Sequence, residues 1–108
     1  MLDTMHSRDL ASYKPISTLF TALADPVRLA IVDRLAREGE MTVGKLGAPF
    51  EITAPAISRH LKVLETAGLI ERRVDRQWRV CSLRQTALTG ATSWLNTVAT
   101  PVALETVS

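Results

Sequence analysis

Cysteine, aromatic residues and long apolar segments are scarce in this sequence of 108 residues. Cys81 is the single cysteine, which excludes an internal disulfide and a zinc site built from several cysteines, and which fits a reducing compartment. No apolar run approaches the roughly 18 residues of a membrane-spanning helix, and the N-terminus lacks a secretory signal pattern. Because the chain is too short for two domains of ordinary size, we expect a single domain. The scarcity of cysteine and of long apolar segments leads us to expect a cytoplasmic protein with no membrane partner.

The sequence also lacks the residue patterns on which enzymes depend. It shows no glycine-rich phosphate loop, no paired catalytic carboxylates and no nucleophile beside a base. His6 and His60 have no partner at a spacing that would suit a metal ion. We therefore expect neither enzymatic activity nor a bound cofactor or metal.

Positive charge is concentrated between residues 53 and 84. This stretch holds seven Lys or Arg residues and three acids, which gives it a net charge of +4, whereas the whole chain has a net charge of only +2. Basic charge gathered in this way is typical of a nucleic-acid-binding surface, although a hairpin rich in arginine is often only a solvated face.

The apolar periodicity predicts four helices, a hairpin and a fifth helix. Residues 1–14 show no sustained period and are expected to form a flexible tail, some of which could extend the first helix. Helices are predicted from Pro15 to the Asp25-Pro26 pair, from there to Gly39, over 43–48 until Pro49, over 54–67, and over 87–100. Their inward residues are predicted to include Leu19, Leu23, Val27, Ala30, Ile31, Leu35, Ala36, Val43, Leu46, Ile57, Leu61 and Leu64.

Residues 69–74 and 78–83 have the composition of two strands, and residues 75–77 form the connection between them. Because an isolated hairpin is only marginally stable, this one must pack on the helices. The predicted fold is mainly α with a β-hairpin wing, a winged helix-turn-helix domain over residues 15–108.

The helix over 54–67 has the properties of a recognition helix that enters the DNA major groove. Its outward residues are small or basic, which permits close approach and hydrogen bonds to base edges or phosphates, and the wing adds cations for the phosphates or the minor groove. The predicted DNA contacts are Thr53, Ala54, Ala56, Ser58, Arg59, His60, Lys62, Arg73, Arg76 and Gln77.

Three segments carry a resemblance to a known family. LFTALADPVRLAIVDRL, PAISRHLKVLETAGLIERR and RQWRVCSL together resemble the ArsR/SmtB family of bacterial winged-helix repressors, over about residues 16–84. The resemblance implies a homodimer whose interface uses the first and last helices, an inverted-repeat operator in double-stranded DNA, and repression that a signal relieves.

The last helix carries more apolar surface than so small a domain can cover, which independently favours a dimer over a helix that folds back on its own chain. The predicted interface residues are Leu19, Phe20, Leu88, Ala91, Trp94, Leu95 and Val98.

The signal is not evident in the sequence. The residues of the two familiar metal sites of the family are absent, because the segment MTVGKLGAPF has no Cys or His and the last helix has no Asp or His. The position of His60 favours a structural or DNA-proximal hydrogen bond. Cys81 is a candidate redox sensor, although a lone cysteine in a strand is more often a small apolar residue. The partners are therefore DNA, a second copy and an inducer of unspecified chemistry, with a protein-protein interaction module as the alternative function.

Overall fold

The computed structural model describes residues 7–102 of the chain. The elements are, in order, α1 (Ser7–Ala11), α2 (Lys14–Leu23), α3 (Pro26–Glu38), β1 (Met41–Thr42), α4 (Val43–Gly47), the 3-10 helix η2 (Ala48–Phe50), α5 (Ala54–Thr66), β2 (Ile70–Asp75), β3 (Trp78–Leu83), the 3-10 helix η3 (Gln85–Leu88) and α6 (Thr89–Ala99). The predicted fold class, mainly α with a β-hairpin wing, is confirmed.

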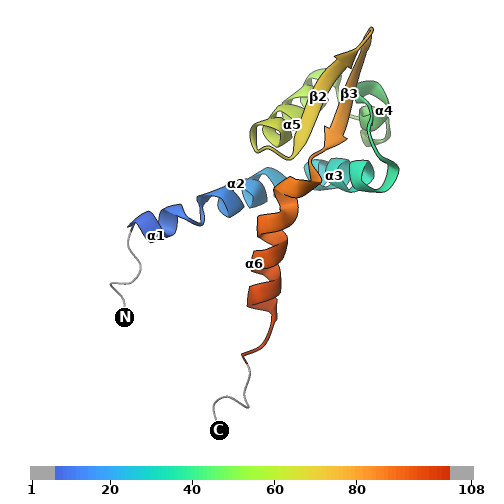
Figure 1. Ribbon diagram of the computed structural model, residues 1–108. Helices are drawn as coiled ribbons and strands as arrows, with labels where there is room; N and C mark the ends of the chain where they lie inside the picture. The colour runs from blue at the N-terminus through green and yellow to red at the C-terminus, as the bar shows by residue number, and fades with distance from the viewer. Residues whose placement is uncertain (1–6, 103–108) are drawn as a thin grey trace.

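Two regions are distinguished in Figure 1. The helices α3, α4 and α5 gather beside the β2–β3 hairpin, whose tip projects beyond them. The α1–α2 segment and α6 extend away from this body as two diverging arms, so that much of each arm is exposed. The DNA-binding elements that we predicted therefore lie in the body, and the predicted dimer helices form the arms.

The predicted helix starts depend on local caps that the structure confirms. The Asp25 carboxylate accepts hydrogen bonds from the backbone amides of Val27 and Arg28, at 2.9 and 3.1 Å, and Pro26 occupies the first turn. Backbone bonds from these amides lower the pKa of Asp25. The hydroxyls of Thr42 and Thr53 cap α4 and α5 in the same way.

The sheet has one strand more than we predicted. Strand β1 pairs with β3 through Met41 opposite Cys81 and Thr42 opposite Val80, and the strand order is β1-β3-β2, antiparallel throughout. A strand of two residues is too short to show an alternating apolar pattern in the sequence. It is stabilised by pairing with its neighbour across the sheet. Its effect is to fix the base of the hairpin to the segment between α3 and α4.

Several predicted boundaries are corrected by the structure. Residues 7–11 of the predicted tail form α1, Lys14 begins α2, and residues 1–6 lie outside the described residues. The third predicted helix ends at Gly47, one residue earlier than predicted, and the chain continues through Pro49 as the 3-10 helix η2, which tolerates a proline in its first turn. The last predicted helix begins as η3 and becomes α-helical only at Thr89.

The core is one cluster formed by all the elements of the body together with α2 and the start of α6. Ile31, Leu46, Leu61 and Leu64 are almost completely buried, as predicted. Ala36 was predicted to face inward and is exposed, while Val32 is buried, because α3 contacts both α5 and β3 and its buried stripe is rotated toward them. In the described part of the chain no single helix could cross a membrane; α2 and α3 reach the required length and composition only as a pair bent by 98°.

Candidate nucleic-acid interface

Helix α5 presents one apolar and one polar face. Ile57, Leu61 and Leu64 are buried against the body, as their spacing requires. The predicted contacts on the other face are exposed, except for Ala56 and His60, which are half-buried. The exposed set is Thr53, Ala54, Ser58, Arg59 and Lys62.

Small side chains on the exposed face allow another molecule to approach the backbone of α5 closely. Ala54 lies in the first turn, and Ser58 follows one turn later. Arg59 and Lys62 flank this surface, and neither makes an ion pair within the described residues. The first half of α5 is therefore a surface of unpaired donors around small residues, which suits the base edges and phosphates of a DNA groove.

His60 points toward the start of α3 and has a structural role. Its Nδ1 lies 3.2 Å from Nη1 of Arg28 and 3.8 Å from the Asp25 carboxylate, and Nε of Arg28 donates to the carbonyl of Ala22. Since Arg28 can only donate, Nδ1 is the acceptor in this bond. Of the two roles that the sequence left open for His60, the structure supplies the partners for the structural one: it joins the recognition helix to the cap of α3.

The tip of the wing is exposed and basic. Asp75 and Trp78 pair across the hairpin, so Arg76 and Gln77 form a connection of two residues. Arg76 has a φ of +60°, in the left-handed region that such tight connections require. Arg76 and Arg79 make no ion pair among the described residues, and both are exposed.

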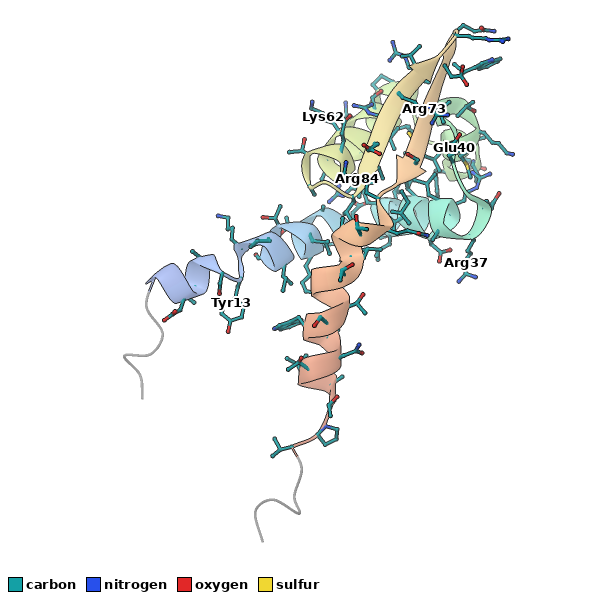
Figure 2. All side chains as sticks on the ribbon, in the orientation of Figure 1. Tyr13, Arg37, Glu40, Lys62, Arg73 and Arg84 are labelled. Carbon is teal, nitrogen blue, oxygen red and sulfur yellow. The ribbon has the colours of Figure 1, made fainter. Side chains whose placement is uncertain are left out.

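The other arginines on and beside the hairpin are already paired with acids. Arg73 donates two hydrogen bonds to the Glu40 carboxylate, at 2.8 and 3.0 Å, and Figure 2 shows these two side chains meeting at the side of the wing. This pairing lowers the pKa of Glu40. Arg72 pairs with Glu65 at 2.8 Å, and Arg84 pairs with Glu71 at 3.0 Å. The free cations of the wing are therefore at its tip and at Arg79, whereas Arg73, a predicted DNA contact, is held by an acid.

Comparison with known proteins agrees with this architecture. A family described as a helix-turn-helix domain matches residues 23–73, from the end of α2 into β2. The HTH-type transcriptional regulator Rv2034 of Mycobacterium tuberculosis is 42% identical over 79 residues, which are 73% of this chain and 73% of that protein. The transcriptional repressor SdpR of Bacillus subtilis is 35% identical over 80 residues, 74% of this chain and 88% of that protein.

Among solved structures, the ArsR family transcriptional regulator RHA00566 superposes with a TM-score of 0.73 at 32% identity, covering 80% of this chain and 88% of that one. The chain belongs to the ArsR family of transcriptional regulators. Within this ArsR-family fold, α4 and α5 form the helix-turn-helix, and β2 and β3 form the wing.

The predicted dimer residues of this ArsR-family protein fall into three groups by exposure. Leu19 and Ala91 are each only 5% exposed, so their own protomer already covers them. Trp94, Leu95 and Val98 are 37, 47 and 56% exposed, and they follow one side of α6. Phe20 and Leu88 are half-buried.

The space between the two arms is apolar. Phe20 packs edge-on against Trp94 with ring centroids 5.8 Å apart. Beside them lies a groove of about 440 Å³, which is lined by aromatic and aliphatic side chains of α2 and by Trp94. The apolar surface between the arms is therefore formed by α2 together with Trp94 of α6.

The remaining sensor candidate in this ArsR-family protein is Cys81, and it lies in the core. The Cys81 side chain is completely buried, and burial raises the pKa of its thiol. A thiolate is the reactive form of cysteine, so this environment suppresses the reactivity that a redox sensor needs. Within residues 7–102, no three His, Cys, Asp or Glu side chains lie close enough together to hold a metal ion.

Proposed function

We propose that this protein is a sequence-specific, DNA-binding transcriptional repressor that acts as a homodimer on an inverted-repeat operator. The observation that carries the proposal is the exposed face of α5, where Ser58, Arg59 and Lys62 form no ion pair or side-chain hydrogen bond within the described residues. Arg76 and Gln77 at the wing tip extend this surface beyond the helix. The names of the relatives, a regulator and a repressor, support the same role.

In this proposal the contacts divide between two grooves. The first turns of α5 read base edges in the major groove, and Arg76 at the tip binds phosphates or the adjacent minor groove. In a symmetric dimer the second α5 lies about one helical turn of DNA away, which is why we expect two half-sites in opposite orientation. The proposed role is regulation rather than turnover, because the unpaired polar groups lie on an exposed helix face and at the tip of a wing.

The test is binding of the purified protein to DNA from upstream of its own gene and to a scrambled duplex, each across a salt series. We expect preference for one sequence, together with affinity that falls steeply as salt rises, because bound cations are released from the phosphates. If the upstream fragment is not preferred, selection from random duplexes would locate the operator.

An alternative function is docking of the basic wing on an acidic protein. Three of the wing arginines already bind acids within the chain, which shows that this surface accepts carboxylates. Absence of binding to any duplex at low salt would contradict the repressor and favour this alternative.

A further inference from the structure

A second basic surface of this protein lies away from the wing, between α2 and α5. The two helices contact one another and leave a groove of about 490 Å³, here called the α2–α5 groove. Lys14 of α2 and Lys62 of α5 are its two basic lining residues, and both are exposed. None of the predicted dimer residues lines this groove.

The lining of the α2–α5 groove combines three aliphatic residues with the hydroxyl residues Ser17, Thr18, Thr21 and Thr66. Ala22, which is only 3% exposed, and the half-buried Ala67 form its floor. Val63 and the side chain of Thr18 contribute methyl groups to its walls. A volume of this size is within the range of small-molecule sites, which typically hold a largely apolar ligand with a few polar groups to orient it.

The charge on this groove has only one sign. No acid lines it, and neither Lys14 nor Lys62 has an ion-pair partner within the described residues. Glu65, one turn from Lys62 on α5, attracts Lys62 electrostatically but forms its ion pair with Arg72, at 2.8 Å. Two ammonium groups without an ion-pair partner beside an aliphatic floor are complementary to a molecule that has an anionic group and an apolar chain.

We propose that the α2–α5 groove is an inducer site and that it binds a small carboxylate with an alkyl body. The carboxylate lies between Lys14 and Lys62, and the alkyl part covers Ala22 and Ala67. Hydroxyls of the groove, such as that of Thr18, supply further donors to the carboxylate.

The position of the groove supplies a mechanism of induction, which rests on the function proposed above. Lys62 belongs to the recognition helix, where it is a predicted DNA contact. A carboxylate bound to its ammonium group competes with that contact and places a negative charge beside the DNA. Because coupling between two ligands is reciprocal, DNA must weaken carboxylate binding by the same factor.

Binding in the absence of DNA tests the site itself. Titration calorimetry of the full chain is carried out with octanoate, octylammonium and acetate as probes. We expect saturable binding of octanoate, at least tenfold weaker binding of acetate, which has no body, and no binding of octylammonium, which has the wrong charge. Lys14→Gln should weaken octanoate binding at least tenfold, while the matched variant Lys45→Gln, which alters an exposed lysine of α4 outside the groove, should bind octanoate as the unaltered protein does.

Equal binding of octanoate and octylammonium, or no saturable binding of either, would overturn the proposal. An unchanged octanoate affinity of Lys14→Gln would also overturn the proposal, since the carboxylate of octanoate would then bind elsewhere. These readouts do not involve DNA, so they decide the groove even if the protein proves not to be a repressor.

The effect on DNA is measured second, at constant ionic strength. We expect saturating octanoate to lower operator affinity at least tenfold in the unaltered protein and to have little effect on Lys14→Gln, which keeps its operator affinity. If Lys14→Gln weakens DNA binding in the absence of octanoate as much as Lys62→Gln does, the groove is a contact for DNA phosphates and the inducer site is refuted.

Discussion

Arg59 is the residue for which the structure makes the most specific DNA prediction. It is exposed on α5, follows Ser58 on the surface that carries small side chains, and has no acid within the described residues to hold it. An arginine in this position can form two hydrogen bonds to a guanine edge. Arg59→Ala should therefore reduce operator affinity by about 1–3 kcal/mol and relax the preference at one position, measured by fluorescence anisotropy with single-base operator variants.

The matched control for this prediction is Arg37→Ala. Arg37 is also an exposed helical arginine, but it lies on α3 and pairs with Asp33, one turn away, so its removal should leave operator affinity within a factor of about two. An equal loss in both variants would mean that Arg59 contributes only general positive charge.

Cys81 gives a prediction about reactivity. Because its thiol is completely buried and its pKa is raised, alkylation by iodoacetamide at neutral pH should be at least about tenfold slower in the folded protein than in urea. Mild oxidation should likewise leave DNA binding unchanged, with Cys81→Ala as the reference protein. Rapid labelling of the folded chain, or oxidant-sensitive binding that Cys81→Ala abolishes, would restore the redox-sensor hypothesis.

At the scale of the element, the wing is held by a salt bridge that occupies one of its predicted DNA contacts. The side chains of Arg73 and Glu40 come from segments 33 residues apart, and the lowered pKa of Glu40 keeps it ionised at neutral pH. Glu40→Gln should release Arg73 and remove a negative charge near the DNA. We expect tighter binding to all duplexes and a salt slope steeper by up to about one unit, measured by anisotropy across a salt series.

Glu38→Gln is the control for the wing prediction, because Glu38 pairs with Arg34 on α3 and its loss does not affect the hairpin. Weaker rather than tighter binding by Glu40→Gln would show that the salt bridge positions the wing for DNA. In that case Arg73 would be a positioning residue and not a masked phosphate contact.

The two glycines of α4 make opposite predictions for stability. A Cβ on Gly47 would lie 2.9 Å from Cγ1 and 3.1 Å from Cδ1 of the buried Ile57, where the turn of the helix-turn-helix packs on α5. A Cβ on Gly44 would meet no atom within 4 Å. Gly47→Ala should therefore lower the free energy of unfolding by about 1–3 kcal/mol. Gly44→Ala should raise it by about 0.5–1 kcal/mol, with both changes measured by urea denaturation.

A destabilised Gly44→Ala would contradict the open space at that position, and a neutral Gly47→Ala would mean that Ile57 adopts another rotamer at little cost. The pair also illustrates what a sequence can show about an element. A pattern of apolar residues places α4 and α5 and their inward faces, but how closely two helices approach depends on side chains from both.

Features encoded by neighbouring residues were predictable, whereas features made by distant partners were not. Helix starts could be predicted at Asp25, Thr42 and Thr53, because a capping side chain accepts hydrogen bonds from backbone amides only two or three residues away. Strand β1 and the pairing of Arg73 with Glu40 depend on partners more than 30 residues away. The sequence therefore predicted which α5 residues of the candidate interface are exposed. It did not predict that His60 and Arg73 have partners within the chain.

At the scale of the whole molecule, the apolar arms require a partner. Leu95 and Val98 remain about half exposed on α6, and the arms leave the body in different directions (Figure 1), so no part of the described chain covers them. Exposed apolar surface of this kind on a small domain marks an interface, and a twofold-symmetric dimer would bury it on both copies. The α6 residues that are exposed, rather than Leu19 and Ala91, should supply the contact energy.

Leu95→Asp should convert the protein from a dimer to a folded monomer, because a charge at the centre of an apolar interface loses its water and gains no partner. The mass in analytical ultracentrifugation should halve, and operator affinity should fall by at least about tenfold since two half-sites are no longer bound together. Asn96→Asp adds the same charge on the neighbouring, polar side of α6 and should stay dimeric. A dimeric Leu95→Asp with unchanged circular dichroism would place the interface elsewhere, whereas a monomeric unaltered protein would mean that each operator half-site is bound independently.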